Sequence, residues 1–339
     1  MSASKFINIF KMSCFFVTSL LLARLVSRPV VLCFHRIGKS SGGLLDRLVG
    51  VTDPDSFRKI INYLRILGYR FVSLEDLKNS IAISRLERVA VVTFDDGFKD
   101  LYQNAFPILK KLNIPFTLFL TTSCVESEKL LWLHKLYIDI ERLSPISRLE
   151  ILKQYGNGRN TECELCDIVG KIIDSNHINL IEKMSLATKI ANEAGLTEKE
   201  ERLIAEKLYL TKAELREMER YGLSIEVHGH EHLPLFNLSR GEAEKEIGSS
   251  VSYVMQELNR KPRFYCLPYG IDNPFVQDIA MDLGLSGIAT TEQRIVKSLE
   301  NAYALPRICV TTDIMHFYRR LARSYGKAFL EKMHLVESN

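Results

Sequence analysis

Two adjacent carboxylates, Asp95 and Asp96, stand at the end of an apolar segment that carries no charge. Residues 89–94, VAVVTF, predict a buried strand because the segment is short and rich in β-branched and aromatic side chains. Like charges side by side at a strand end repel each other, so the pair has no evident structural benefit. Either DDG forms an ordinary turn, for which Asp and Gly are well suited, or the two carboxylates have different chemical tasks.

Three alternating histidines, His228, His230 and His232, follow an apolar strand predicted at 223–227. Neutral imidazoles are the commonest nitrogen ligands of zinc, and two of them four residues apart can converge on one ion from a helical turn. Two nitrogens leave such a site incomplete, and a carboxylate of the DD pair would complete it. One aspartate would then bind the metal while the other moves a proton. In an extended chain, His230 points away from its two neighbours.

The segments that position these residues alternate between strands and helices, which predicts an α/β fold with a parallel sheet or barrel. Apolar residues at helical spacing predict a helix that ends at Gly68. A second helix at 101–113 is expected to kink or to begin afresh at Pro107. Strands are predicted at 30–37, 69–74, 89–94, 115–120, 223–227, 263–267, 286–291 and 304–310, and later helices at 240–258, 274–283 and 313–335.

The pattern changes between about Glu126 and Glu219, where polar and apolar residues alternate at helical spacing and no strand is evident. Thr211 and Glu214 have the spacing of a capping box. We expect the segment 126–210 to be a helical insertion within one domain.

Composition excludes some classes of function. The 339 residues are 46% hydrophobic and 25% charged, with a net charge of +4, as in ordinary globular proteins. No basic run with interleaved aromatic residues is present, so we expect no nucleic-acid partner. The seven cysteines are odd in number and scattered, which fits reduced thiols better than a secreted disulfide framework.

The N-terminal residues 1–28 form an apolar segment interrupted by Lys11. Its uninterrupted part, 12–23, is shorter than the roughly 20 residues that a membrane span needs, and no small-residue cleavage site follows it. The flanking cations suit a helix at residues 5–28 that lies on an anionic membrane surface. A helix packed on the domain is an equally good alternative. We expect a protein that is cytoplasmic or associated with the inner membrane, rather than secreted.

Three motifs together resemble the polysaccharide deacetylases, the metal-dependent carbohydrate esterases with a NodB homology domain. TFDDG at 93–97, HGHEHLPL at 228–235 and LPYG at 267–270 match the motifs of that family in order. The resemblance covers about residues 30–310, and the segments LCFHRI and LPRI are similar to a bacterial branch found with surface-glycan synthesis genes. It implies a distorted (β/α) barrel of about seven strands, formed by residues 29–339 including the insertion.

The resemblance also implies a role for individual residues. Asp95 would be the general base, and Asp96, His228 and His232 would bind a divalent metal ion, zinc or alternatively cobalt. The segment Pro268–Tyr269 would contribute to the substrate site, with the backbone N–H of Tyr269 holding the oxyanion.

Two departures from the family pattern concern the proton-transfer residues. Cys266 stands where the family has an arginine that orients the catalytic aspartate, and Arg307 could replace it or form an ordinary surface salt bridge. The late histidine that supplies the general acid is not evident. His35, at the end of the first strand, is the candidate acid, unless it is bonded to backbone.

The function expected is therefore hydrolytic removal of an acetyl group, N-acetyl in the first place, from a sugar unit of a glycan or glycan precursor. The alternatives are O-deacetylation, which differs in the leaving group, and a non-catalytic glycan-binding protein that retains the deacetylase fold.

Overall fold

The computed structural model describes residues 21–22, 25–82, 88–155, 180–270, 274–297, 301–310 and 313–333. The helix expected at 1–28, with its membrane-facing part at 5–28, lies almost wholly outside these ranges. No helix in the described part of the chain has both the length and the hydropathy of a bilayer-crossing segment.

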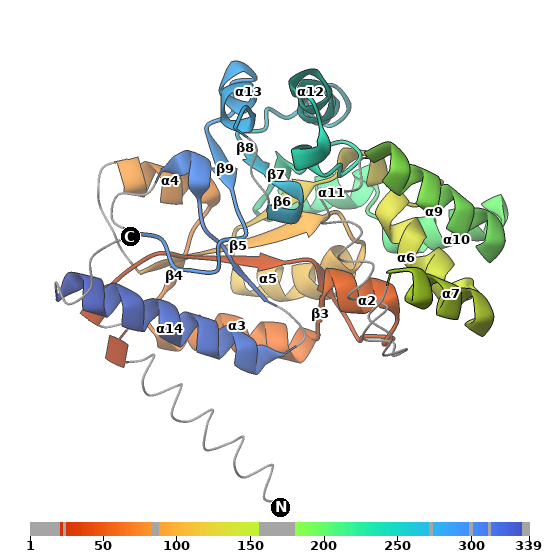
Figure 1. Cartoon of the computed structure of the whole chain (residues 1–339). Coiled ribbons are helices and arrows are strands. Elements are labelled where there is room, and N and C mark those ends of the chain that lie inside the picture. Colours follow the sequence, from red (N-terminus) through yellow and green to blue (C-terminus); the bar gives the residue numbers. More distant parts are fainter. Residues whose placement is uncertain are drawn as a thin grey trace, which may run out of the picture.

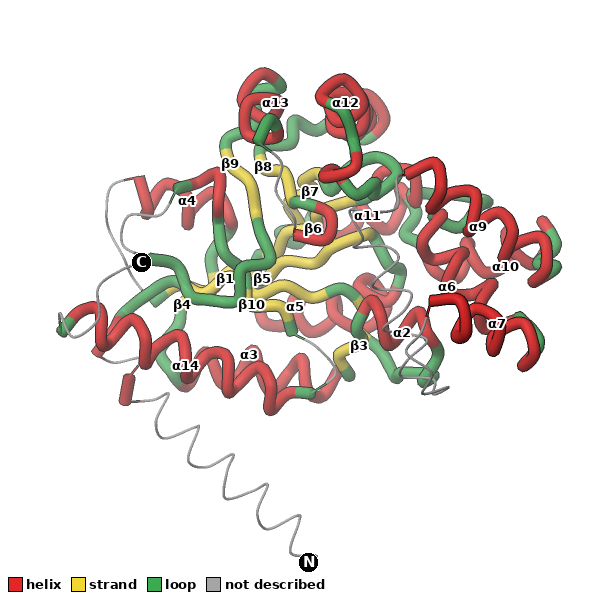
Figure 2. The backbone as a smooth tube through the Cα atoms, viewed as in Figure 1, coloured by secondary structure: helices red, strands yellow, loops and turns green. Residues whose placement is uncertain are grey.

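The centre of the molecule is a curled parallel sheet (Figures 1 and 2). Its strand order is β10-β1-β5-β6-β7-β8-β9, and the short β4 pairs with the beginning of β5. A separate ladder joins β2 (Arg36–Ile37) to β3 (Val51–Thr52). The strands of the main sheet are β1 (Val30–Phe34), β4 (Arg70–Phe71), β5 (Val89–Asp96), β6 (Phe116–Leu120), β7 (Leu223–Val227), β8 (Phe264–Cys266), β9 (Gly287–Ala289) and β10 (Ile308–Cys309).

The two ends of this strand order meet through the segment that leads into β10. Leu305 bridges Ala289 of β9 in parallel, and its backbone N–H donates to the Ile288 carbonyl at 2.9 Å. Three residues further on, at Ile308, β10 pairs with β1. The sheet therefore curls back on itself, which confirms the predicted distorted (β/α) barrel of about seven strands.

Strand residues alternate between the inside and the outside of this barrel, because side chains in a strand have a period of two. Val31, Val91, Phe119 and Phe264 belong to one buried cluster inside the sheet. Their sequence neighbours belong to the larger cluster that packs under the helices. Because both faces are covered, β5 is buried along its whole length and reads as an uninterrupted apolar run.

Helices surround the sheet on both sides, with α3 and α14 on one side and α12 and α13 on the other (Figure 1). α3 and α14 are in contact, since the rings of Tyr63 and Tyr318 lie 4.7 Å apart. The helices outside the insertion are α2 (Leu44–Val49), α3 (Pro54–Ile66), α4 (Leu74–Ala82), α5 (Phe106–Leu112), α11 (Lys212–Glu219), α12 (Arg240–Glu257), α13 (Val276–Asp282) and α14 (Ile314–Lys332).

Several predicted elements differ in detail from the structure, and two of these differences have a clear local cause. The strand expected at 69–74 is only two residues long, because Ser73 accepts a hydrogen bond from the Asp76 N–H and starts α4. The helix expected at 101–113 begins with a π-helical turn at Leu101–Ala105, and α5 starts afresh beside Pro107.

The described part of the segment 126–210 is helical and packs at one end of the barrel (Figure 1). Its helices are α6 (Trp132–Arg142), α7 (Pro145–Tyr155), α9 (Leu180–Ala194) and α10 (Glu198–Leu208). They have a small apolar cluster of their own, in which Leu44 of α2 joins Leu133, Leu136 and Ile190. The strands before and after this segment, β6 and β7, still pair directly.

Three phenylalanines tie α3 to the strands that lead to the candidate site. The ring of Phe57 on α3 lies 5.0 Å from that of Phe34 and 6.0 Å from that of Phe94. All three side chains are fully buried. This contact fixes the helix against β1 and β5.

We expect Phe57→Ala to lower the free energy of unfolding by about 3–5 kcal/mol, because it leaves a cavity between α3 and the sheet. Ile66→Ala, on the same helix but 61% exposed, is the matched control and should cost less than about 0.5 kcal/mol. Urea unfolding monitored by circular dichroism measures both. Equal losses in the two variants would contradict this account of the core.

Candidate active site

The candidate residues meet at the carboxyl ends of the parallel strands. Asp95 and Asp96 end β5, and His228 directly follows β7. β6 lies between these strands, and the His228 N–H donates to the Leu120 carbonyl at its end. Parallel strands bring their carboxyl ends to one edge, where barrel enzymes carry their catalytic residues.

Arg307 forms a buried, bidentate ion pair with Asp95. Its Nη1 and Nη2 atoms donate to the two carboxylate oxygens at 2.7 and 2.8 Å. The side chains of Arg307 and Asp95 are 0% and 2% exposed. The alternative of an ordinary surface salt bridge is therefore wrong.

The remaining donors of the guanidinium are also satisfied. Nε donates to the Thr290 carbonyl at 3.0 Å, Nη1 to the Thr93 hydroxyl at 3.2 Å and Nη2 to the Cys266 sulfur at 2.9 Å. With the two bonds to Asp95, the five N–H groups of the side chain all have an acceptor. A fully satisfied guanidinium can stay charged in the barrel interior.

This pairing sets the charge of Asp95. Burial alone would raise the pKa of the carboxyl group, but the Arg307 guanidinium outweighs burial and holds the pKa well below its ordinary value. Two thiols, Cys33 and Cys266, approach the carboxylate oxygen Oδ2 at 3.6 and 3.8 Å. Asp95 is therefore a fixed, ionised acceptor at neutral pH.

Asp96, His228 and His232 form a second cluster beside this pair. The Nε2 atoms of His228 and His232 lie 3.7 and 3.5 Å from one carboxylate oxygen of Asp96, and 3.2 Å from each other. One ligand atom from each residue falls within 4.8 Å of the others. Two nitrogens and one carboxylate oxygen are a donor set that suits zinc.

Protonation in this cluster favours a bound cation. The Nδ1 atom of His228 lies 2.9 Å from the Cys266 carbonyl, which fixes the proton on Nδ1 and leaves the lone pair on Nε2 toward Asp96. Burial lowers the pKa of His228 to about 4, and burial also holds the pKa of His232 well below its ordinary value. Burial and the neighbouring Asp95 raise the pKa of Asp96 to about 8. A divalent ion would compensate the buried charge and hold Asp96 ionised.

The histidine loop reaches this geometry through a turn and not through the helical turn that the i, i+4 spacing suggested. Gly229 has φ +89, and a Cβ atom there would lie 2.7 Å from the Glu246 carboxylate. Glu246, on α12, accepts hydrogen bonds from the backbone N–H groups of Glu231 and Leu233 at 2.8 and 3.4 Å. Its side chain holds the loop so that His228 and His232 converge.

Backbone strain is concentrated at the same place. Asp96, His232 and Tyr269 have φ values of +74, +53 and +61. Non-glycine residues in this region cost about 1–3 kcal/mol each and persist where the surrounding structure fixes them. Such outliers cluster at functional sites.

His35 and the Pro268–Tyr269 segment lie at the border of the site. The His35 Nε2 atom is 3.9 Å from Asp95 Oδ2, and burial lowers the pKa of this histidine. Pro268 and Tyr269 belong to a short 3₁₀ turn, and the Tyr269 ring packs edge-on at 4.9 Å from the His232 ring. The structure thus brings these candidates to the two clusters, while their catalytic roles remain predictions.

His230 is separate from the cluster. Its Nδ1 atom is 2.8 Å from the Thr122 hydroxyl, and its Nε2 atom is 3.6 Å from the Glu231 carboxylate. Both contacts lie outside the Asp96–His228–His232 cluster.

Sequence reasoning missed Thr93, Cys33 and Glu246 as supporting residues. Thr93 and Cys33 are detectable in principle, because strand alternation puts them on the same face as Asp95. Glu246 offers no comparable signal, since its contact depends on how α12 packs.

Comparison with known proteins agrees with this geometry. A sequence model described as polysaccharide deacetylase matches residues 83–288. The chain belongs to the polysaccharide deacetylase family. It is therefore a hydrolase of the deacetylase class, as the sequence motifs predicted.

Two similar proteins illustrate the extent of the match. The poly-beta-1,6-N-acetyl-D-glucosamine N-deacetylase of Staphylococcus aureus is 22% identical to this deacetylase over 278 residues, which are 78% of this chain and 69% of the relative. The structure of the Streptococcus pyogenes deacetylase PplD in complex with acetate aligns with a TM-score of 0.57 at 19% identity, covering 88% of this chain and 98% of that one. The structural likeness supports the fold.

We expect Arg307→Met to destabilise the deacetylase by about 3–5 kcal/mol, because it leaves the Asp95 charge buried without a partner. The double variant Asp95→Asn/Arg307→Met should recover part of this loss, since no charge then remains. Chemical unfolding of the single and double variants measures the coupling.

The control for this cycle is Arg58→Met. Arg58 pairs with Asp55 at 2.6 Å on the surface of α3, with side chains that are 50% and 76% exposed. The free energy of unfolding of Arg58→Met should fall by less than about 1 kcal/mol. An Arg307→Met variant no less stable than Arg58→Met would refute the structural importance of the buried pair.

Proposed function

We propose that this deacetylase removes N-acetyl groups from a sugar unit of a glycan in a metal-dependent hydrolysis. The observation that carries the proposal is the position of the Asp96–His228–His232 cluster directly beside the arginine-paired carboxylate of Asp95. The N-deacetylase name of the S. aureus relative supports the choice of N-acetyl over O-acetyl.

The residues that would hold the metal ion are Asp96, His228 and His232. The Nε2 atoms of His228 and His232 lie 3.2 Å apart and face one carboxylate oxygen of Asp96, so three ligand atoms converge and the site fits a small cation. A divalent ion in this cluster would supply Lewis acidity that polarises an acetyl carbonyl and acidifies water. Zinc is the metal we propose, with cobalt as an alternative.

Asp95 is the proton acceptor in this proposal. Arg307 holds its carboxylate in one orientation and in the ionised form, so the carboxylate can take a proton from water without first losing one. The low pKa means that Asp95 holds this proton only briefly. The proton then has to reach the leaving amine. His35, whose Nε2 atom lies 3.9 Å from Asp95 Oδ2, is the candidate to accept it and donate it to that amine.

Tyr269 is the candidate for holding the carbonyl oxygen. Its positive φ sets the orientation of the backbone next to His232, and an N–H fixed in place beforehand can stabilise developing negative charge. The glycan-binding alternative rested on the arginine missing at position 266 and on the late histidine that is not evident. Since Arg307 contacts both Asp95 and the Cys266 sulfur, the first of these objections is weakened.

The metal ligands can be tested by metal content. His228→Ala and His232→Ala should each lose most of the bound zinc, whereas the matched His230→Ala variant should retain it, because His230 bonds to Thr122 outside the cluster. Plasma emission spectrometry of the purified variants gives the ratio of metal to protein. Loss of zinc from His230→Ala, with retention in the other two, would reverse this assignment.

The base can be tested independently of the metal. Asp95→Asn should lower the rate of acetate release from N-acetylglucosamine oligomers by about 10²–10⁴-fold with metal content unchanged. Asp96→Asn should lower the metal content itself. Undiminished acetate release by Asp95→Asn would refute the mechanism even if the metal assignment held.

A further inference from the structure

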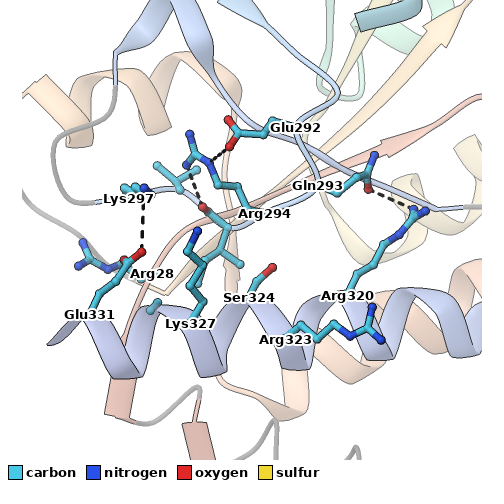
Figure 3. A pocket seen from close by; sticks show the side chains of 13 residues that line it. Arg28, Glu292, Gln293, Arg294, Lys297, Arg320, Arg323, Ser324, Lys327 and Glu331 are labelled. Carbon is cyan, nitrogen blue, oxygen red and sulfur yellow. Dashed lines mark hydrogen bonds and ion pairs between the residues drawn. The ribbon is translucent and has the colours of Figure 1, made fainter. Parts of the chain in front are cut away.

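A second candidate site lies along the side of the barrel, between α14 and residues 292–297 (Figure 3). It is a cavity of about 430 Å³ that also reaches Arg28, just before β1. None of the catalytic candidates lines it. Its size falls within the range of small-molecule sites.

Positive charge is concentrated in this cavity. Six cationic side chains and two carboxylates are part of its lining. The excess of four positive charges equals the net charge of the whole chain, which is +4. The lining cations are Arg28, Arg294, Lys297, Arg320, Arg323 and Lys327, and the carboxylates are Glu292 and Glu331.

The two carboxylates already have cationic partners. Glu292 accepts from Arg294 Nε at 2.5 Å, and Glu331 lies 4.0 Å from Lys297 Nζ. Figure 3 shows both pairs at the edge of the cavity. They leave most of the positive charge of the cavity without compensation.

The other four cations have no such ion pair in the described part of the chain. Arg320 donates only to neutral acceptors, the Gln293 side chain at 3.1 Å and the Cys309 carbonyl at 2.8 Å. Arg28 Nη1 is buried and has no hydrogen-bond partner among the described atoms, and Glu331 attracts its charge from beyond ion-pair distance. Arg323 and Lys327 are exposed, and no described carboxylate lies within ion-pair distance of them.

The spacing of the cationic side chains on α14 places like charges close together, which is unfavourable without a counter-ion. Arg320, Arg323 and Lys327 follow at i, i+3 and i+7, which places like charges on one face of the helix. Buried Ser324 and Ala328 are small residues that line the same cavity. An anion in the cavity would contact several cationic side chains at once. The planar guanidinium group of arginine can donate two parallel hydrogen bonds to phosphate oxygens, so a phosphate fits best.

The residues around the cavity indicate which kind of molecule carries this phosphate. The chain enters the barrel next to this cavity, since Lys332 Nζ at the end of α14 donates to the Leu25 carbonyl at 3.0 Å. Leu21 and Leu25 are 57% and 51% exposed, and Met333 is 54% exposed. Exposed apolar residues beside a cationic site are the pattern of a surface that binds anionic lipids.

We propose that this cavity binds the phosphate headgroup of an anionic membrane lipid and so orients the deacetylase on a membrane surface. The site is independent of the catalytic function proposed above. It would hold the barrel by the side that carries α14, with the candidate active site outside the contact.

The test is binding of the full chain to phosphatidylcholine vesicles with and without phosphatidylglycerol, measured by co-flotation. The variant Arg320→Gln/Arg323→Gln/Lys327→Gln should bind phosphatidylglycerol vesicles about a hundredfold more weakly, with binding to neutral vesicles unchanged. Since Arg320 also donates to backbone, Arg323→Gln/Lys327→Gln is a second variant whose altered side chains are both exposed. This variant should bind phosphatidylglycerol vesicles about tenfold more weakly than the wild type.

The matched control is Arg216→Gln/Arg220→Gln/Lys245→Gln, which removes the same charge from exposed positions around α11 and α12. It should bind like the wild type. Equal losses in the control and in the cavity variants would overturn the proposal, because they indicate a response to net charge alone. Equal binding of the wild type to vesicles with and without phosphatidylglycerol would also overturn the proposal.

Sodium pyrophosphate in solution distinguishes a lipid from a free phosphate. Calorimetry should show at most weak binding that disappears in the cavity variants. Tight binding of pyrophosphate at this cavity, without any preference for phosphatidylglycerol vesicles, would overturn the lipid assignment and identify a site for a soluble phosphate.

Discussion

The buried ion pair between Arg307 and Asp95 is the interaction on which the candidate site depends. Two charges in the interior of a barrel are unfavourable unless every donor and acceptor has a partner. Here the cost is offset by acceptors from three strands or strand ends, Thr93, Cys266 and Thr290. The arrangement fixes the orientation of Asp95, and with it the position of the adjoining residue Asp96.

The Asp96–His228–His232 cluster contains backbone conformations that only the surrounding structure maintains. Asp96 and His232 have positive φ values, which are uncommon for residues other than glycine. The Thr121 N–H donates to the Asp96 carbonyl at 3.0 Å and helps to hold that backbone. The Glu246 carboxylate accepts a hydrogen bond from the backbone of the histidine loop, and the Tyr269 ring packs edge-on against the His232 ring. Rigid support of this kind is what positions ligands before a cation arrives. The site is therefore a property of several elements and not of the motif alone.

The sequence predicted most of the architecture because the informative signals are local. The strand that ends in DDG, the histidine triplet and the alternation of strands and helices each follow from residues within one short window. The strand predicted at 69–74 was too long, because Ser73 starts a helix where the prediction continued the strand.

From the sequence, the contact between Arg307 and Asp95 was only one of two alternatives, the other being an ordinary surface salt bridge of Arg307. The two residues are 212 positions apart, and their meeting depends on closure of the barrel at Leu305. The loop geometry at His232 was mistaken for a helical turn for a related reason. The Glu246 carboxylate that shapes the loop comes from a separate helix, and periodicity within the loop does not reveal it.

Barrel closure also has a consequence for synthesis on the ribosome. β1 is the first strand of the barrel to emerge, yet one of its two partners is β10, the last barrel strand in the sequence. Until β10 is available, the apolar residues 30–34 present an unpaired strand edge, which is a template for aggregation. A nascent chain that stops before Arg307 already contains both aspartates and all three histidines of the site, but the Asp95 charge has no counter-ion. Truncation at this point should therefore produce a chaperone-dependent, aggregating polypeptide and not a partly active enzyme.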